Sequence, residues 1–419
     1  MSELWAADKA IVDVAPEDLA YVRFLTTYAV EKERRKDLVD AFVFVSNSTS
    51  TNRRIAFPTK ITDTLWRIDL RDYNYTHAAW EFIAKRDPYF KYTVHRLSDL
   101  TTSANPVLRM DYFVAEALVE PSYSKLLGLP GDLASLKKKF FIQEDAIATF
   151  HLQQQGATLD SIVALHNRQL VRYPTIFGYF WFTRDAFTNA NQNNVTEPEN
   201  IFAIRFDGFE ALWTLPNGLQ AGWLGNAQEK QVEKVPSDIA QDSVTKFRDK
   251  QVYNYRSCAR CHYRGINHFN DIISQMLQHD DIVLVEANRD KRVAIEDLYL
   301  SGIEEKIDED RRTYAKALAS CYPDRKADSD DQLEKLCLDI AVLVEQVIYQ
   351  YREGWIDSSV AARELGIPEK DLPDQVYKKA ISGELTGVLS VLASGGRVRR
   401  DAWESAWPKA NQLLYRKIK

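Results

Sequence analysis

Apolar residues recur at helical spacing along much of the chain. From residue 269 onward this spacing predicts helices over residues 269–277, 294–300, 311–320, 333–351, 358–365 and 402–417. Earlier in the chain it predicts two helices within residues 16–44, and further helices at 78–85, 107–119 and 132–139. Residues 64–73 instead alternate apolar and charged side chains, which predicts one half-buried strand.

Three short alternating runs, at residues 201–205, 211–215 and 221–224, predict a small antiparallel sheet. Asp207-Gly208 and Pro216-Asn217-Gly218 supply the residue types that hairpin turns favour. Residues 173–187 form an unusually aromatic stretch. The expected fold class is mainly α with a small antiparallel β-sheet (α+β). It is divided into a largely helical region 1–195 with one strand, a region 196–300 with the small sheet, and a helical region 301–419.

Composition narrows the class of protein. A chain of 419 residues is long enough for one large hydrophobic core or two to three ordinary ones. Charged residues make up 27% of the chain, the net charge is −6, and both signs are interspersed without a long basic run. This pattern argues against nucleic acid as the partner. No apolar run approaches the length of a membrane span, so no transmembrane segment is predicted.

One stretch carries specific chemistry. Cys258-Ala259-Arg260-Cys261-His262 is the Cys-x-x-Cys-His attachment sequence of a c-type haem. Two thiols about one helical turn apart can add across the two vinyl groups of one porphyrin edge, and the following histidine becomes the proximal iron ligand. We therefore predict one covalent haem c, held by Cys258 and Cys261 with His262 on the iron, and Arg264 as a further cofactor-binding residue. The expected fold then has a cytochrome c-like haem region embedded in a larger helical protein.

Two other kinds of site use the same residue types. A structural zinc site needs a second close pair of thiols or histidines, whereas Cys321 and Cys337 lie far from the motif and from each other. A thioredoxin-type redox pair needs a strand before it and a helix after it, within a β-α-β unit that is not evident here. The sequence therefore favours haem c.

The sixth iron ligand stays open. Small electron carriers place a methionine downstream of the motif, but this chain has only Met1, Met110 and Met276, and no histidine or methionine follows His279. An open or water-bound iron is one alternative. The candidate ligands are Met110, His166 and His268, with His77, His95, His151, Met276 and His279 as further possibilities.

The sixth ligand decides between classes of function. A six-coordinate iron transfers electrons, whereas a five-coordinate iron binds peroxide or oxygen and needs a distal base or donor, for which His166, Arg168 or Arg109 are the candidates. A third class is a binding protein in which the haem mainly stabilises the fold. Arg67 and Arg71 in the alternating strand have two interpretations as well, an ion-paired solvated face or a contact with a buried anion such as a haem propionate.

The N-terminal residues, beginning Met1-Ser2-Glu3, lack the basic and apolar parts of a secretory signal. Because haem c is attached outside the cytoplasmic membrane in bacteria, we interpret the sequence as a mature form whose leader has been removed. The predicted localisation is periplasmic or extracellular. In such an oxidising compartment Cys321 and Cys337 have two alternatives, a disulfide or free thiols.

The chain contains several longer motifs: Trp66-Arg67-Ile68-Asp69-Leu70-Arg71-Asp72-Tyr73, Leu108-Arg109-Met110-Asp111-Tyr112-Phe113, Leu215-Pro216-Asn217-Gly218-Leu219-Gln220-Ala221, the segment from Cys258 to Gly265, Ala361-Ala362-Arg363-Glu364-Leu365-Gly366 and Val398-Arg399-Arg400-Asp401-Ala402-Trp403. With these motifs the chain resembles a group of bacterial mono-haem cytochrome c-like proteins, known mostly from planctomycetes and related phyla. The resemblance covers roughly residues 19–408. It implies one covalent haem and a secreted or periplasmic localisation. The chain departs from the group around His166-Asn167-Arg168, where the group tends to have a stretch rich in glycine and asparagine.

From the Cys-x-x-Cys-His motif and the family resemblance together, we expect a periplasmic or secreted mono-haem c-type cytochrome that acts in electron transfer. Its partner is then a redox protein or a small-molecule electron donor or acceptor. The alternative is a haem-dependent oxidoreductase of the peroxidase or oxidase type with an open distal site.

Overall fold

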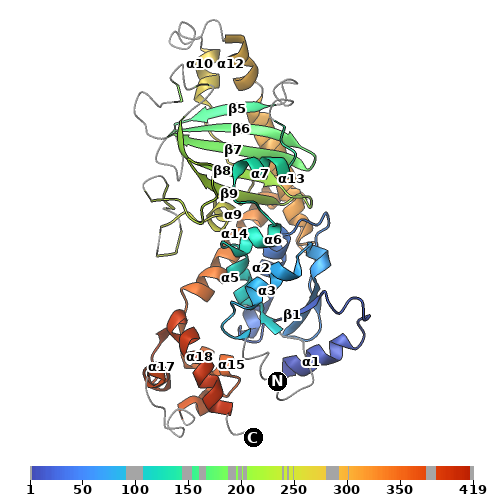
Figure 1. Ribbon diagram of the computed structural model, residues 1–419, viewed down its shortest axis with the longest axis vertical. Coiled ribbons are helices and arrows are strands. Elements are labelled where there is room, and N and C mark those ends of the chain that lie inside the picture. Colours follow the sequence, from blue (N-terminus) through green and yellow to red (C-terminus); the bar gives the residue numbers. More distant parts are fainter. Residues whose placement is uncertain are drawn as a thin grey trace. The chain divides into compact units, whose positions relative to one another are not determined.

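The computed structural model describes residues 2–90, 107–143, 153–159, 167–186, 195–196, 201, 205–237, 240–242, 245–248, 250–279, 292–300, 302–373 and 384–415. The chain forms two compact units, and each is assembled from segments that are separate in sequence (Figure 1). The first unit comprises Met1–Ser46, Ala56–Ala117 and Leu343–Lys419; the second comprises Asn47–Ile55 and Leu118–Val342. This division differs from the three consecutive regions expected from the sequence.

The first unit contains a mixed sheet of four strands in the order β2-β3-β1-β4. Its strands are β1 (Val22–Thr26), β2 (Thr59–Lys60), β3 (Leu65–Asp69) and β4 (Val107–Arg109). Strand β1 pairs antiparallel with β3 and parallel with β4. Phe24, Leu65 and Val107 form a core with Ala7 of α1. The helices from the N-terminal half of this unit are α1 (Ser2–Ile11), α2 (Arg35–Ser48), α3 (His77–Ala84) and α5 (Met110–Ala117).

The C-terminal segment of the first unit is largely helical. Its elements are the end of α14 (Asp330–Arg352), β10 (Trp355–Ile356), α15 (Ser358–Leu365), α17 (Glu384–Ala393), β11 (Val398–Arg399) and α18 (Arg400–Tyr415). The short strands β10 and β11 pair antiparallel. Trp403 and Trp407 of α18 pack with Leu365 and Leu392, and Tyr89 joins the same core. This core buries the faces of α15, α17 and α18 whose apolar residues recur at helical spacing.

The second unit is organised around a five-stranded antiparallel sheet in the order β5-β6-β7-β8-β9. Its strands are β5 (Gln154–Thr158), β6 (Arg168–Thr175), β7 (Gly178–Ala186), β8 (Phe206–Thr214) and β9 (Gln220–Asn226). Its helices are α6 (Ser122–Leu127), α7 (Leu133–Lys139), α9 (Arg256–Cys261), α10 (Ile272–Gln278), α12 (Arg292–Tyr299), α13 (Ile303–Ser320) and the first part of α14. Strands that are consecutive in sequence are neighbours in the sheet, so the sheet is an antiparallel meander.

The two faces of this sheet differ in chemistry. Because side chains alternate between faces, the strand register places Arg172 and Trp181 on one face, where both bind Asp310 of α13. The opposite face is aromatic: Trp213 packs against Phe180 and against Phe140 at the end of α7. The polar face is therefore the one that receives charged groups, and it also contacts the Cys-x-x-Cys-His motif described below.

The expected fold class is wrong in the size and number of its sheets. The protein is 46% helical and 19% strand, with the five-stranded antiparallel sheet and the four-stranded mixed sheet, and it is a larger α+β fold. Strands β6 and β7 were missed because most of their side chains are buried on both faces. Such strands lack the apolar–polar alternation that marks a half-solvated strand.

Two N-terminal helices were also placed wrongly. The apolar positions around Val22 belong to strand β1, because β3 and β4 lie on either side of it and supply backbone partners. The helix expected over residues 107–119 begins only at Met110, because the first three residues pair with β1 as strand β4. The alternating stretch expected as one strand ends at Asp69, whose carboxylate accepts a hydrogen bond from the backbone of Arg71 and starts a 3-10 turn over Leu70–Tyr73.

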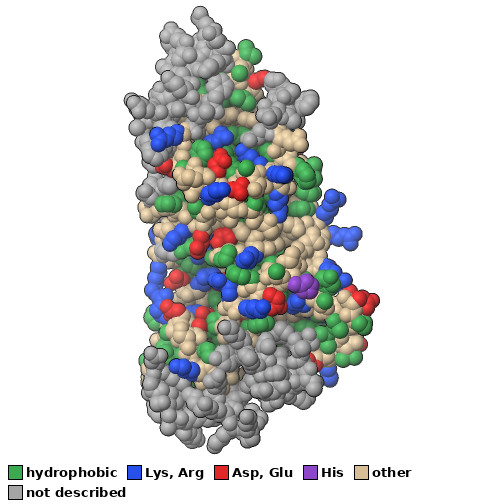
Figure 2. Space-filling view, in the orientation of Figure 1, with side chains coloured by type: hydrophobic (Ala, Val, Ile, Leu, Met, Phe, Trp, Pro, Cys, Tyr) green, Lys and Arg blue, Asp and Glu red, His purple; other side chains and the backbone are tan. Residues whose placement is uncertain are grey.

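Over the described part of the face in Figure 2, Lys and Arg side chains are interspersed with Asp and Glu side chains. Within the described residues, no helix has both the length and the apolar content that crossing a membrane requires.

Candidate functional site

The Cys-x-x-Cys-His motif lies on the short helix α9, with His262 as the residue that ends it. The helix packs against β9 at Gly222, where an added Cβ would lie 3.3 Å from the Tyr255 ring and 3.5 Å from the Cβ of Cys258. A larger side chain at this position would push the helix away from the sheet. Gly222 therefore allows Cys258 to lie directly over the polar face of the sheet.

Residues just before α9 attach it to the sheet. Asn254 accepts a hydrogen bond from the backbone of Leu224 at 3.0 Å, and Tyr255 donates one from its hydroxyl to the carbonyl of Gln220. The Tyr255 ring stacks on Tyr123, with centroids 4.3 Å apart. Tyr255 has a φ of 55°, an uncommon conformation for a residue with a side chain, which these contacts hold in place.

Both thiols and the imidazole of the motif line one cavity of about 40 Å³ in the second unit. From the sheet, Arg168 of β6 and Glu210 of β8 face the same cavity. Its remaining lining residues are Asp185, Gly208, Phe209, Leu224, Gly225, Val235, Ala240, Asp242, Val252 and Ser257. The site thus combines the donor set of a haem attachment sequence with a buried charged pair from the sheet.

The ring of His262 is held at both nitrogens. Its Nδ1 lies 3.3 Å from the carbonyl oxygen of Gly265, and its Nε2 lies 3.4 Å from Oε1 of Glu210. Gly265 has a φ of 89°, which allows the tight turn that brings this carbonyl back to the ring. A histidine whose Nδ1–H donates to a backbone carbonyl presents Nε2 for another partner, as metal-binding histidines commonly do.

Glu210 is the electrostatic centre of the site. Burial alone would raise the pKa of its carboxyl, but His262 and Arg168 outweigh burial and lower that pKa to about 2. Arg168 also pairs with Asp185, with Nε 2.7 Å from Oδ1. The same pairing, against the effect of burial, raises the pKa of the Arg168 guanidinium. Glu210 is therefore ionised at neutral pH.

The environment of Cys258 bears on whether its thiol could act in a thioredoxin-type redox pair. Burial, followed by the neighbouring Glu210 carboxylate, raises the pKa of Cys258 well above its ordinary value. A thioredoxin-type pair requires the opposite, a lowered pKa at its first cysteine. The thiol of Cys258 is thus unsuited to act as a thiolate nucleophile, and a dithiol redox role is disfavoured.

The donor set fits a c-type haem, but the space does not. Cavities that hold cofactors measure about 300–1,000 Å³, whereas the cavity at His262 has a volume of about 40 Å³. Its outer wall is formed by Val235, Ala240 and Val252, from the connection between β9 and α9. A macrocycle at this place would require that wall to move outward.

Two of the predicted site residues lie elsewhere in the second unit. Arg264 forms an ion pair with Glu334 of α14, and His268 lies 3.1 Å from Asp308. Both line a separate cavity of about 330 Å³ and neither lines the cavity at His262. Arg168, predicted as a possible distal group, does line the cavity at His262.

The other proposed ligands are distributed as follows. Met110 is fully buried in the first unit, His77 on the surface of that unit contacts Arg23, and His95, His151 and His166 lie outside the described residues. In the second unit, Met276 packs against the core between α10 and α12, and His279 ends α10. Among the described residues, the structure brings none of them to Nε2 of His262.

Three further sequence alternatives are resolved by contacts. Cys321 and Cys337 are both buried free thiols. Arg71 forms ion pairs with Asp18 and Asp69, which matches the solvated ion-pair face rather than a buried anion. Arg67 donates to the carbonyl of Ala10 at 3.4 Å.

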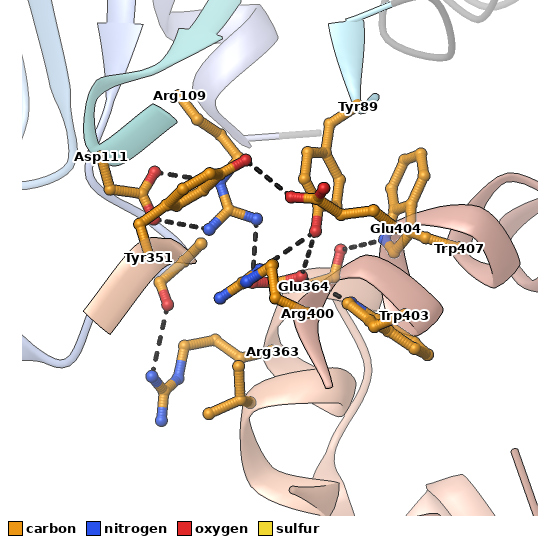
Figure 3. Close-up of polar contacts among 12 residues, drawn as sticks. Tyr89, Arg109, Asp111, Tyr351, Arg363, Glu364, Arg400, Trp403, Glu404 and Trp407 are labelled. Atoms are coloured by element: carbon orange, nitrogen blue, oxygen red, sulfur yellow. Dashed lines mark hydrogen bonds and ion pairs between the residues drawn. The ribbon is translucent and has the colours of Figure 1, made fainter. Parts of the chain in front are cut away.

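A second buried polar cluster, in the first unit, was not predicted (Figure 3). Its centre is Glu364 of α15, whose Oε1 lies 2.8 Å from Nη1 of Arg109 and 2.7 Å from Nη1 of Arg400. The other carboxylate oxygen accepts hydrogen bonds from Tyr89 and Trp403, at 2.9 and 2.6 Å. Three of the motifs noted in the sequence thus meet at one carboxylate.

The charges of this cluster compensate one another. Burial would raise the pKa of Glu364, but Arg109 and Arg400 outweigh it and lower that pKa to about 2. Arg109 also pairs with Asp111 through two nitrogens, at 3.0 and 2.6 Å. The sequence signal for Arg109 is an arginine inside an apolar run, and a glutamate in such a run is the signal for Glu210 in Phe209-Glu210-Ala211-Leu212. Glu364 and Arg400 each have charged neighbours in sequence and lack this signal.

Among the described residues, no group of three or more His, Cys, Asp or Glu side chains has an arrangement that would hold a metal ion. Comparisons of the chain with models of known families, with curated proteins and with solved structures found no match.

Proposed function

We propose that this protein is a periplasmic or secreted mono-haem c-type cytochrome that acts in electron transfer. The haem is attached through Cys258 and Cys261, with His262 as the proximal ligand. One observation carries this proposal: the two thiols and the imidazole line one cavity while Nδ1 of His262 is held by a backbone carbonyl. When bound, the haem supplies a redox-active iron.

The chain's own residues have defined tasks in this proposal. The carbonyl of Gly265 fixes the tautomer and orientation of the His262 ring. The packing of α9 on Gly222 and the Tyr255 contacts hold both cysteines against the sheet. A bound haem would require the wall formed by Val235, Ala240 and Val252 to lie further out, and these residues belong to a connection rather than to a strand or helix.

A haem-dependent oxidoreductase is the second candidate, because Arg168 lines the cavity and is a type of donor that peroxide chemistry uses. Its guanidinium is already paired with Asp185, 2.7 Å away, and faces Glu210 at 3.7 Å. That pairing leaves electron transfer as the leading proposal.

The test is expression behind a secretory leader in a bacterium that has a haem c maturation system. We expect a haem-stained band that survives denaturing electrophoresis. The double variant Cys258→Ala/Cys261→Ala should be unstained, whereas the matched control Cys321→Ala/Cys337→Ala should stain fully. A wild-type chain that folds but never stains would refute the attachment. In a stained protein, a low-spin spectrum unaffected by carbon monoxide supports electron transfer, and a high-spin spectrum that shifts with peroxide supports the oxidoreductase.

A further inference from the structure

The first unit contains a cavity of about 220 Å³ beside the Glu364 cluster. Its lining comes from the segment before α2, from β4 and α5, from the end of α14, from β10, and from α15 and α18. Arg109, Arg363 and Arg400, one from each of three sequence motifs, all line it. This cavity belongs entirely to the first unit and shares no residue with the one at His262.

Not every hydrogen-bond donor of the arginine side chains in this cavity has an acceptor. Arg109 uses its three guanidinium nitrogens on Asp111 and Glu364. Arg400 has a side chain that is only 9% exposed, and its Nη1 donates to Glu364 and Tyr89. The Nε of Arg400 is buried and has no hydrogen-bond partner. A buried N–H donor without an acceptor is costly, so an acceptor at this place would be favoured.

Two more polar side chains of the lining lack partners. The side-chain oxygen of Gln350 is buried without a hydrogen bond, and a terminal amide can present either its oxygen or its NH₂ group. The guanidinium of Arg34 makes no hydrogen bond or ion pair with any residue that the structure describes. Arg363 makes only long contacts, 3.3 Å to the carbonyl of Ala29 and 3.4 Å to Glu31. The unused groups around the cavity are therefore mainly hydrogen-bond donors.

The acidic residues of the lining do not provide acceptors for these unused donors. Asp111 accepts both of its charged hydrogen bonds from Arg109, and its Oδ1 also accepts from the backbone of Tyr112. Glu31 and Asp37 are exposed residues on the outer part of the lining, where solvent screens them.

The rest of the lining is apolar. Leu38, Val347, Tyr351, Ile356 and Val360 contribute to its wall. Trp355 also lines the cavity although it is 52% exposed, which is unusual for so large an apolar side chain. A few unused donors beside an apolar wall are the kind of lining that small-molecule sites have, and a volume of about 220 Å³ limits the occupant to a ligand smaller than a cofactor.

We propose that this cavity binds a small monocarboxylate with an apolar, preferably aromatic, body. The carboxylate accepts hydrogen bonds from Arg400, Arg34 and the amide of Gln350. The body packs against Tyr351 and the aliphatic wall, with Trp355 covering it from the solvent side. The proposal does not depend on the haem.

The experiment is calorimetric titration of the full chain with phenylacetate, with acetate and 2-phenylethanol as matched compounds that lack the ring or the charge. We expect phenylacetate to bind with a dissociation constant below about 1 mM. Acetate and 2-phenylethanol should each bind at least about tenfold more weakly, because acetate lacks the aromatic ring and 2-phenylethanol lacks the carboxylate. Tryptophan fluorescence should change on binding in the wild type and not in Trp355→Leu.

Variants assign the binding to this cavity. Arg34→Gln should weaken phenylacetate binding about tenfold, as expected for a lost charge-assisted hydrogen bond. Arg35→Gln is the matched control, since Arg35 donates to the carbonyl of Val30 and does not line the cavity. Arg400→Lys keeps a cation beside Glu364 and should weaken binding further. If that variant does not fold, Gln350→Leu takes its place.

Three results would overturn the proposal. They are the absence of saturable phenylacetate binding, equal binding of 2-phenylethanol, and an Arg34→Gln variant that binds as the wild type does.

Discussion

Replacing Glu364 by glutamine tests whether the buried cluster holds the first unit together. The side chain of Glu364 is 1% exposed and bridges Arg109 and Arg400. Glutamine keeps the shape but removes the charge, so two buried guanidinium groups lose their shared counterion. Its NH₂ group also faces the guanidinium groups of Arg109 and Arg400 or the indole N–H of Trp403, which are all hydrogen-bond donors.

The magnitude follows from the pKa of Glu364, which the cluster lowers from its ordinary 4.5 to about 2. Each pKa unit of such a difference corresponds to about 1.4 kcal/mol, so the ionised carboxylate contributes roughly 3 kcal/mol at neutral pH. Breaking a buried ion pair by removing one partner typically costs about 3–5 kcal/mol, which agrees. We expect Glu364→Gln to lose roughly 3 kcal/mol of the free energy of unfolding at pH 7.

The pH dependence gives the sharper signature. Because the folded-state pKa lies below the unfolded one, this stabilisation is fully present above about pH 4.5. It is lost as the pH falls through the window down to about 2. The difference between wild type and Glu364→Gln should therefore shrink as the solution is acidified from pH 5 to about pH 2.5.

The assay is urea unfolding followed by pulsed hydrogen exchange, resolved into peptides from residues 343–415 and from residues 118–342. The loss should appear in the first set and not in the second, because the cluster lies within the first unit. Asp63→Asn is the matched control, since Asp63 pairs with Lys60 at the surface with its side chain 83% exposed, and it should leave the midpoint unchanged. A Glu364→Gln protein as stable as wild type at pH 7, or a loss that stays constant on acidification, would refute the reasoning.

Two further predictions concern the second unit. Burial raises the pKa of both Cys321 and Cys337 to about 12, so in the native protein at pH 8 iodoacetamide should modify them much more slowly than in urea; modification at equal rates would contradict their burial. Gly265→Ala places a side chain at a φ of 89° and 3.4 Å from the backbone of Arg311, and should cost about 1–2 kcal/mol of unfolding free energy. Gly131→Ala, where nothing lies within 4 Å, is its control in the same urea titration.

The sequence predicted the C-terminal helices well and the sheets poorly, for a physical reason. Helix α15 was predicted with its observed bounds because its apolar residues mark a single buried face. Strand β7 was missed because five consecutive residues from Tyr179 to Thr183 are buried, which hides the period of two. The sequence predicts a helix where strand β1 lies, because the partners of this strand, β3 and β4, are remote in sequence.

The same contrast applies to the candidate sites. Cys258, Cys261 and His262 were found because their spacing alone indicates a chemistry. Glu210 and Asp185 were not, since their meeting with the motif depends on how strands β7 and β8 are paired with each other and with α9. Glu364 and Arg400 lie in motifs that the sequence shows, but the contact of Glu364 with Arg109 spans more than 250 residues of sequence, a distance over which no local pattern predicts contact.

The interrupted course of the chain through its two units has a consequence for synthesis. During translation, Leu118–Val342 emerges as a continuous segment, with its five-stranded sheet and the Cys-x-x-Cys-His helix complete. The first unit has to wait, because Glu364, which pairs with both Arg109 and Arg400, is available only after α15 and α18 have left the ribosome. Until then, Arg109 and the apolar residues of Met1–Ser46 and Ala56–Ala117 lack the covering that Leu343–Lys419 provides. A nascent chain that has left the ribosome up to a point between residues 343 and 400 would thus carry a finished second unit and an incomplete first one.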